Sequence, residues 1–465
     1  MVKRDSERVP RQTLGSGHGR DRGARTAPRP EDRRAAEPFP TGEDDIPAAE
    51  SQAEVRQHGR ERAVLVGVAT GKVARPTVEA HLDELAQLVD TAGGEAVARM
   101  VQERKSPDPT FFIGKGKVGE LASLANANGA KLVVFDDDLS PAQARHLDEA
   151  LPEDVKVLDR AGVILDIFAL RARTREAQTQ VELAQLSYLL SRLTRRWAHL
   201  SRQAGGIGTR GVGETQLESD RRIIRRRIAA LRERLEGIER ERAVQRKRRS
   251  LLPGVALVGY TNAGKSTLFE RLTGTQTLVE DRLFATLDPR TRRAEIGDGL
   301  VVTVADTVGF IRKLPHHLVA SFRATLAEAA LAQVVVHLVD ASHADWSDHL
   351  DVGEEVLETL GVDPKSCVIA LNKIDRIDGG PPPAPPDRTV VAISALTGQG
   401  LDRLRSEVRS AVLSEPGIEV LRFPAAGGEE LQRALQEETV VARRFSEAGI
   451  ELVVRRRDGK AEGGR

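Results

Sequence analysis

Several short segments between residues 259 and 396 carry side chains suited to holding phosphates and a base. The first is Gly259-Tyr-Thr-Asn-Ala-Gly-Lys-Ser266, which follows the apolar run Val255–Val258 and precedes a helical pattern at Thr267–Leu272. Glycines in such a loop let successive N–H groups face phosphate oxygens, and the start of the next helix adds its dipole. We expect Lys265 to reach the β- and γ-phosphates and the Ser266 hydroxyl to bind Mg²⁺.

A second segment, Asp306-Thr-Val-Gly309, stands where the apolar run Val301–Ala305 ends. A carboxylate there can hold Mg²⁺ through a water, while the Gly309 N–H faces the γ-phosphate. Thr286, within Phe284-Ala-Thr-Leu-Asp288, is expected to complete the Mg²⁺ coordination through its hydroxyl. The predicted catalytic residues are Lys265, Thr286, Asp306 and Gly309, and the predicted metal ligands are Ser266 and Thr286.

The base is predicted to be guanine. Asp375, in Asn372-Lys-Ile-Asp375, can accept two hydrogen bonds from the guanine ring N–H and amino group, which adenine cannot supply. Asn372 would brace the loop, the Lys373 stem would lie along the base, and the Ala395 amide of Ser394-Ala-Leu396 would donate to the guanine oxygen. The full set of predicted nucleotide-binding residues is Gly259, Tyr260, Thr261, Asn262, Ala263, Gly264, Lys265, Ser266, Phe284, Ala285, Thr286, Leu287, Asp288, Asp306, Thr307, Val308, Gly309, Asn372, Lys373, Ile374, Asp375, Ser394, Ala395 and Leu396.

Phe310 directly follows the Gly309 motif, at the position where Ras-like GTPases place a water-orienting Gln. A phenyl ring cannot orient water by hydrogen bonding. We therefore hypothesise slow intrinsic hydrolysis, with a partner or a cation completing the site. Asn262 is a candidate ligand for that cation, K⁺.

The elements around these segments predict a multidomain α/β protein with a P-loop GTPase domain built on a mostly parallel sheet. Strands are expected near 255–258, 301–305, 334–339, 367–371 and 389–393, separated by helices. A second α/β domain is expected upstream, with strands near 63–68, 110–113, 131–135 and 155–158. Two helices near 181–193 and 217–238 form a hairpin between the two, and strands 418–423 and 449–454 flank a helix near 429–445. The predicted domains are a disordered basic tail (1–58), an N-terminal α/β domain (59–173), the hairpin (174–250), the GTPase domain (251–413) and a small C-terminal α+β domain (414–465).

Composition limits the other possibilities. Hydrophobic residues make up 40% of the 465-residue chain but aromatics only 3%, so the cores must be aliphatic. The single cysteine, Cys367, excludes an intramolecular disulfide and is interpreted as a buried strand residue. No signal peptide and no run near the roughly 20 apolar residues of a transmembrane helix are recognisable. The expected location is the cytoplasm, without stable membrane insertion, and a monomer is sufficient.

Positive charge collects in the predicted hairpin. Residues 192–249 hold 18 Arg or Lys and 7 Asp or Glu, a balance of +11 that favours a polyanionic partner. A charged coiled-coil surface is the alternative. The loop Gly205–Glu214 is either a flexible hinge or a probe that orders on RNA, and the candidate RNA contacts are Arg195, Arg196, Arg202 and, as the main phosphate ligand, Arg210. Residues 1–34 add 10 basic and 5 acidic side chains, a balance of +5, in a tail without an assigned partner.

These motifs together resemble the HflX family of ribosome-associated GTPases, within the P-loop GTPase superfamily. The resemblance covers about residues 60–460 and departs from the family at Val212, where proline is usual. It implies GTP and GDP as ligands, and the large ribosomal subunit with its ribosomal RNA as partner, in splitting, rescue or assembly of ribosomes. The stretches that carry it are Phe112–Val118, Phe135–Pro141, Gln180–Ala184, Gly205–Gly211, Gly259–Phe269, Ala285–Pro289 and Asp306–Phe310.

Two other functions stay open on the sequence alone. Phe310 is compatible with a ribosome- or RNA-binding module whose nucleotide is mainly structural. The turn Gly114-Lys-Gly-Lys117 could hold an anion or a second nucleotide, as in an ATP-driven RNA remodeller, although an ordinary helix start explains it as well.

Overall fold

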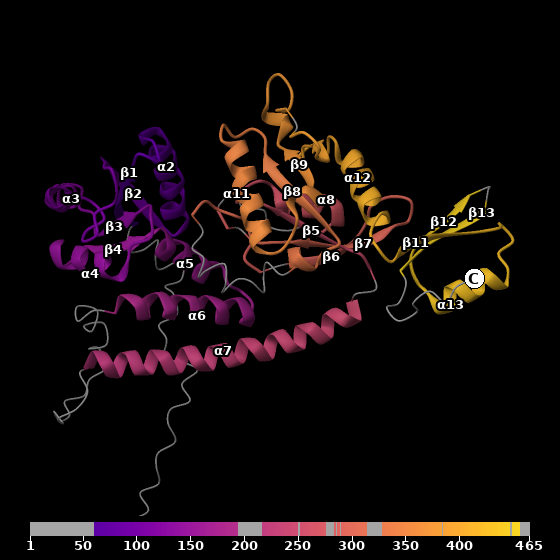
Figure 1. Ribbon diagram of the computed structural model, residues 1–465, viewed down its shortest axis with the longest axis horizontal. Helices are drawn as coiled ribbons and strands as arrows, with labels where there is room; N and C mark the ends of the chain where they lie inside the picture. Colours follow the sequence, from indigo (N-terminus) through magenta and orange to yellow (C-terminus); the bar gives the residue numbers. More distant parts are fainter. Residues whose placement is uncertain are drawn as a thin grey trace, which may run out of the picture. The chain divides into compact units, whose positions relative to one another are not determined.

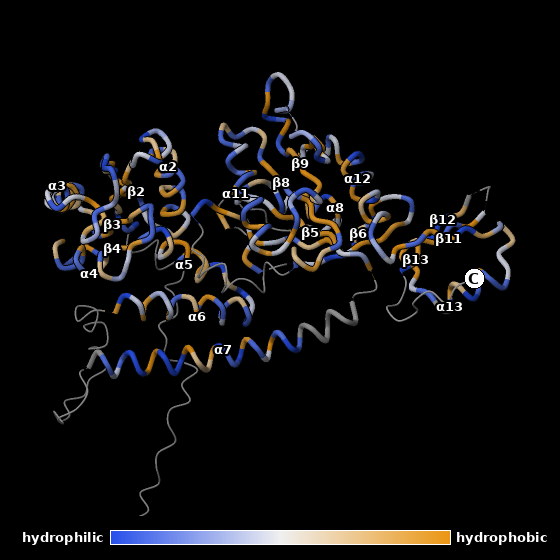
Figure 2. Tube along the Cα trace, viewed as in Figure 1, coloured by the Kyte–Doolittle hydropathy of each residue, from blue (hydrophilic) through white to orange (hydrophobic). Residues whose placement is uncertain are grey.

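The computed structural model describes most of the chain and shows a multidomain α/β protein (Figure 1). The described residues are 60–193, 216–249, 252–275, 283–284, 286–288, 290–313, 328–383, 385–446 and 449–455. Among them no helix is both long and apolar enough to cross a membrane. Hydrophobic residues concentrate in the central strands of the two larger sheets, whereas the coloured part of α7 is mostly hydrophilic (Figure 2).

The N-terminal region is a four-stranded parallel sheet in the order β2-β1-β3-β4. Its strands are β1 (Glu61–Ala69), β2 (Gly94–Glu103), β3 (Leu132–Phe135) and β4 (Lys156–Asp159). The strand predicted at residues 110–113 is wrong: Asp108 and Phe112 close a tight turn, and Phe112 has a φ of 67°, which a strand cannot contain. The true second strand, β2, was not predicted, because an edge strand that is only partly buried shows little apolar alternation.

Helices cover both faces of this sheet, and they are α2 (Arg75–Thr91), α3 (Lys115–Ala127), α4 (Pro141–Ala150) and α5 (Arg160–Arg171). Alternate residues of β1 pack into two different cores, Leu65 on the side of α2 and α5 and Val66 on the side of α3 and α4. Gly114 precedes α3 and its N–H donates to Gln102 at 2.8 Å, while Lys117 pairs with Glu120. No side chain caps α3, and no described contact distinguishes an anion site from an ordinary helix start there.

Two helices follow, α6 (Arg175–Arg192) and α7 (Gln216–Arg249). They run antiparallel, because Glu182 pairs with Arg227 at 2.7 Å while Leu193, at the other end of α6, accepts from Arg221 at 3.1 Å. The predicted hairpin therefore has its two helices in contact. The glycine-rich stretch 205–214 and Val212 within it lie outside the described residues, as does the predicted tail 1–58.

The GTPase domain is a six-stranded sheet in the order β10-β9-β8-β5-β7-β6. Its strands are β5 (Gly254–Gly259), β6 (Arg290–Glu295), β7 (Val301–Asp306), β8 (Val334–Asp340), β9 (Val368–Asn372) and β10 (Val390–Ala392). Its helices are α8 (Lys265–Thr273), α11 (Trp346–Thr359) and α12 (Leu401–Leu413), with short 3-10 turns η3 (Pro364–Ser366) and η4 (Ile374–Arg376). All pairs are parallel except β6 with β7, and β6 was not predicted because its charged sequence lacks an apolar pattern.

The C-terminal strands form an antiparallel sheet in the order β11-β13-β12. Its elements are β11 (Ile418–Phe423), α13 (Glu429–Glu437), β12 (Thr439–Ser446) and β13 (Gly449–Arg455). The helix predicted to reach residue 445 is too long, because it ends at Glu437 and the chain then enters β12. The run Thr439-Val-Val441 is rich in β-branched residues, which explains why the helix stops there.

Candidate functional site

The loop between β5 and α8 can be built only with glycine at two positions. Gly259 has a φ of 142°, and a Cβ there would lie 2.1 Å from the Leu338 carbonyl oxygen. Gly264, the residue before α8, has a φ of 95°, and a Cβ there would lie 2.3 Å from Nδ2 of Asn372. Both backbone conformations favour glycine, so these residues let the loop curl against β8 and β9.

Lys265 begins α8 and lies across this loop. Its side chain is buried and its Nζ donates to the carbonyls of Gly259 at 3.0 Å and Tyr260 at 2.7 Å. Burial lowers the pKa of Lys265 to about 8, although the nearby Asp306 carboxylate opposes the shift. A buried cation at the centre of the loop gives the pocket an anion-seeking character.

Three side-chain oxygens meet beside Lys265. Ser266 Oγ lies 2.9 Å from Thr286 Oγ1, and both hydroxyls donate to Oδ2 of Asp306, at 2.9 and 3.1 Å. The other carboxylate oxygen of Asp306 is buried and has no hydrogen-bond partner among the described residues. Burial raises the pKa of Asp306, while Lys265 and the two hydroxyls oppose the shift. Oxygen-only donor sets suit Mg²⁺, so this cluster fits the metal that the sequence predicts.

Asn372 braces the opposite side of the pocket. Its Nδ2 donates to the Ala263 carbonyl at 2.8 Å, and its Oδ1 accepts from the Ala395 N–H at 2.9 Å. The Ala395 amide, expected to face guanine, is therefore directed at Asn372 in this structure. Lys373 pairs with Asp340 at 2.7 Å, and Asp375 is exposed.

One pocket joins the predicted segments. Thr267 and Arg376 also line the pocket, although they were not predicted. Each directly follows a predicted residue, and that position is the one sequence feature that could have identified it. The predicted residues that line the pocket are Thr261, Asn262, Gly264, Lys265, Ser266, Phe284, Thr286, Thr307, Gly309, Asn372, Lys373, Asp375, Ala395 and Leu396. Predicted residues absent from the lining are Gly259, Tyr260, Ala263, Leu287, Asp288, Asp306, Val308, Ile374 and Ser394. Ala285 lies outside the described residues.

Tyr260, a predicted nucleotide-binding residue, makes its side-chain contacts outside the pocket. Its ring stacks on His349 with centroids 3.9 Å apart, and its hydroxyl donates to Glu84 of α2 at 2.9 Å. The same hydroxyl accepts from the backbone N–H of Arg312 at 2.8 Å. Tyr260 therefore connects the phosphate loop to the N-terminal region.

Phe310 is held in place by its backbone and buried. Its N–H donates to the Gly259 carbonyl at 2.9 Å, its carbonyl accepts from the Thr261 N–H at 2.7 Å, and its side chain is 1% exposed. The ring lies near His337, with centroids 6.4 Å apart, and is absent from the pocket lining. Phe310 is therefore placed as a core residue.

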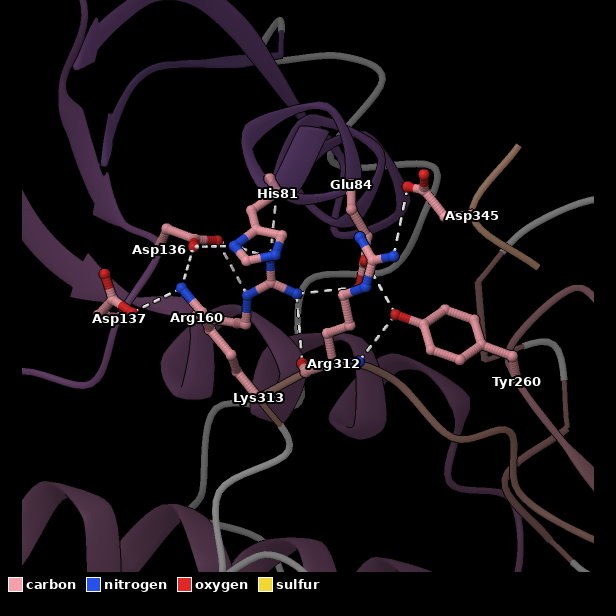
Figure 3. A network of polar contacts seen from close by, with 9 residues as sticks. All are labelled: His81, Glu84, Asp136, Asp137, Arg160, Tyr260, Arg312, Lys313 and Asp345. Atoms are coloured by element: carbon pink, nitrogen blue, oxygen red, sulfur yellow. Dashed lines mark hydrogen bonds and ion pairs between the residues drawn. The ribbon is translucent and has the colours of Figure 1, made fainter. Parts of the chain in front are cut away.

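The segment after Phe310 enters a polar network formed with the N-terminal region (Figure 3). Arg160, at the start of α5, is fully buried and donates to Asp136 at 2.6 Å, to Glu84 at 2.9 Å and to the Arg312 carbonyl at 3.4 Å. Lys313 pairs with Asp136 and with Asp137, the latter at 2.5 Å. Burial opposes ionisation of Asp136, but Arg160 and Lys313 outweigh it and hold the pKa of Asp136 well below its usual value. Asp136 and Asp137 lie in the stretch Phe135–Pro141 that carries the family resemblance, but nothing in the sequence indicated this network.

Other expected features have mixed outcomes. Cys367 is 2% exposed, as predicted, but it lies directly before β9 and not in a strand; burial raises the pKa of its thiol to about 11. The described residues contain no cluster of three or more His, Cys, Asp or Glu side chains that could hold a metal. The candidate RNA contacts Arg195, Arg196, Arg202 and Arg210 all lie outside the described residues.

Family models match the N-terminal region, the helical hairpin and the GTPase domain. Residues 79–169 match the family described as GTP-binding GTPase N-terminal, and residues 171–249 match the GTP-binding GTPase middle region. Residues 254–373 match the family described as 50S ribosome-binding GTPase.

Curated relatives match along most of their length. The GTPase HflX of Escherichia coli K12 is 44% identical over 381 residues, which is 80% of this chain and 89% of the relative. The GTPase HflX of Caldanaerobacter subterraneus is 43% identical over 395 residues, covering 84% and 90%. Among solved structures, a GTP-binding protein from the archaeon Sulfolobus solfataricus in complex with GDP is 25% identical and covers 76% of this chain and 98% of its own, with a TM-score of 0.39.

Proposed function

Since this chain belongs to the HflX family of GTPases and is a GTP hydrolase, we propose that it binds the large ribosomal subunit under the control of its nucleotide. The convergence of Ser266, Thr286 and Asp306 beside Lys265 carries the proposal, because this group can respond to a γ-phosphate. The match of residues 254–373 to ribosome-binding GTPases supports the partner. We also propose that the tail, the N-terminal domain, the hairpin, the GTPase domain and the C-terminal domain are separated at 58/59, 173/174, 250/251 and 413/414.

Five residues in or beside the pocket are given separate parts in hydrolysis. Lys265 would leave its loop carbonyls and bind the β- and γ-phosphates, and the Gly309 N–H would hold the γ-phosphate. Ser266 and Thr286 would hold Mg²⁺, with Asp306 acting through a water. Mg²⁺ held by these residues would neutralise charge that develops on the phosphate oxygens.

Guanine selection is assigned to Asp375. Its carboxylate at the exposed side of the pocket can accept from two guanine N–H groups, and Asn372 fixes the loops on either side. Because the Ala395 N–H donates to Asn372, the base must find its further contacts elsewhere in the lining, where Leu396 and Arg376 are available.

Phe310 makes external help necessary. Its buried ring offers nothing to orient an attacking water, so the chain alone would hydrolyse GTP slowly. The ribosome would supply or position the missing group, and K⁺ held by Asn262 is a second source of help. Hydrolysis would then release Thr286 and the Asp306–Gly309 segment.

Ribosomal RNA is proposed to meet the hairpin. The +11 balance of residues 192–249 is partly visible on α7, where several arginines are exposed. We assign the phosphate contacts to Arg195, Arg196, Arg202 and Arg210, and splitting, rescue and biogenesis of ribosomes are the processes that such a contact would serve.

The test is GTP turnover by the purified chain, alone and with large ribosomal subunits, in potassium and in sodium buffer. We expect strong stimulation by the subunits. Asp375→Ala should weaken GTP binding by about a hundredfold, since two hydrogen bonds to a charged acceptor contribute roughly 3 kcal/mol. Asp378→Ala, which removes another exposed carboxylate of the same loop, is the matched control. GTP binding without any stimulated turnover would favour a nucleotide-gated binding module, and equal rates in both buffers would remove the K⁺ assignment.

A further inference from the structure

Helix α6 is attached at its first residues to the GTPase domain. Asp288 accepts hydrogen bonds from the backbone N–H groups of Arg173, at 3.0 Å, and Thr174, at 3.2 Å. The Thr174 hydroxyl donates to the other oxygen of the same carboxylate and accepts from the Ala177 N–H at 3.2 Å, which caps the helix. One side chain thus satisfies three donors that lie 114 or 115 residues earlier in the chain.

Asp288 stands two residues after Thr286, the threonine that contacts Ser266 and Asp306. Two residues span at most about 7 Å, so a displacement of Thr286 is passed to Asp288 rather than absorbed by intervening chain. On the other side of Thr286, Phe284 packs edge-on against Phe168 of α5, with ring centroids 4.8 Å apart. The segment around Thr286 is therefore anchored to α5 and α6 on both sides.

The segment that follows Asp306–Gly309, the other motif expected to respond to hydrolysis, is attached at a different place. There, Arg160 donates to the Arg312 carbonyl and Asp136 pairs with Lys313 (Figure 3). Asp288 instead reaches the start of α6, a helix of 18 residues and about 27 Å whose far end leads to the glycine-rich stretch. The other end of α6 is held to the N-terminal sheet by Tyr188 and Arg192, which both contact Asp159, so a change at Asp288 acts on the first turn of the hairpin.

We propose that Asp288 is a positioning residue that couples the nucleotide state to the helical hairpin. It holds the start of α6 while Thr286 lies beside Ser266 and Asp306, and it releases α6 when Thr286 leaves them. The proposal rests on the proposed γ-phosphate sensing by Thr286 and does not require ribosome binding.

Hydrogen exchange on the full chain tests the coupling without ribosomes. The amides of Arg173 and Thr174 donate directly to Asp288, so they report whether the contact is formed. With a non-hydrolysable GTP analogue and Mg²⁺ we expect them to exchange at least about tenfold more slowly than with GDP, the scale of one charge-assisted hydrogen bond. Asp288→Ala should abolish that difference.

Thr174 provides a second variant, outside the nucleotide pocket. Thr174→Val removes the hydroxyl that bonds Asp288 and should reduce the nucleotide-dependent difference, while Thr174→Ser should restore it. Thr179→Val is the matched control, because the Thr179 hydroxyl donates only to the Arg175 carbonyl within α6, at 2.6 Å. It should leave the nucleotide response unchanged.

Two results would overturn the coupling. One is equal exchange of these amides with the GTP analogue and with GDP in the unsubstituted chain. The other is a nucleotide response that survives in both Asp288→Ala and Thr174→Val. If Asp288→Ala loses nucleotide binding, measured by GDP titration, the exchange result for Thr174→Val alone decides whether the coupling exists. Failure of the unsubstituted chain to bind the GTP analogue, or of ribosomes to stimulate it, would instead contradict the proposed function.

Discussion

Replacing Arg160 by Met should be one of the most damaging single changes in the N-terminal region. The guanidinium is fully buried and donates to the carboxylates of Asp136 and Glu84 and to the carbonyls of His81 and Arg312, at 2.6 to 3.4 Å. Burial alone would lower the pKa of Arg160, but the two carboxylates outweigh it and raise the pKa, which keeps the group charged. Methionine replaces only the aliphatic stem of arginine and has no hydrogen-bond donor.

The magnitude follows from what the substitution leaves behind. Removing one partner of a buried ion pair typically costs about 3–5 kcal/mol, because the other charge stays buried without compensation. Lys313 still contacts Asp136, whereas Glu84, with a side chain only 11% exposed, keeps just the Tyr260 hydroxyl among the described residues. We therefore expect a loss of about 3 kcal/mol. Native-state hydrogen exchange of the β1 and β3 amides measures it without assuming that the whole chain unfolds in one step.

The control is Arg99→Met. Arg99 pairs with Asp83 at 2.6 Å, but the two side chains are 43% and 65% exposed, and such pairs contribute less than about 1 kcal/mol. The double variant Arg160→Met, Glu84→Gln should cost less than the sum of the two single variants, because it removes the carboxylate that Arg160→Met leaves without a cation. Equal losses for Arg160→Met and Arg99→Met, or strict additivity in the double variant, would refute the reasoning.

Two further predictions concern the GTPase domain. Gly309→Ala would place a Cβ 2.8 Å from Thr261 Cα and 3.0 Å from Lys265 Nζ, so we expect stimulated GTP turnover to fall by more than tenfold while GDP affinity, measured by titration, changes less; equal losses would contradict this. His337 is fully buried, and burial lowers its pKa to about 3, below the value near 6.5 in the unfolded chain. The contribution of neutral His337 to the free energy of unfolding is therefore complete above about pH 6.5 and is lost as the pH falls from there toward 3. His337→Leu should reduce the pH slope of urea unfolding between pH 6 and 4 by about 1.4 kcal/mol per pH unit, and an unchanged slope would show that other groups cause it.

The strongest predictions came from segments whose chemistry is local. The loop Gly259–Ser266 needs glycines at places set by its own backbone, and its position between β5 and α8 is visible as an apolar run followed by helical spacing. Strands such as β5, β8 and β9 are buried on both sides and read as continuous apolar runs. The partly exposed β2 and the charged β6 carry no such pattern, which is why neither was predicted.

The amino-acid sequence by itself determined the family, most of the buried strands of the GTPase domain and nearly all of the residues that line the pocket. Only the tertiary structure decided where Tyr260, Asp288 and Arg160 point. The partner of Tyr260 lies 176 residues away in the chain, those of Asp288 lie 114 and 115 residues away, and the most distant partner of Arg160 lies 152 residues away. Residue type and spacing describe contacts within a few residues, whereas these three depend on how separately formed sheets and helices pack together. That packing attaches the nucleotide site to the N-terminal region and to the hairpin.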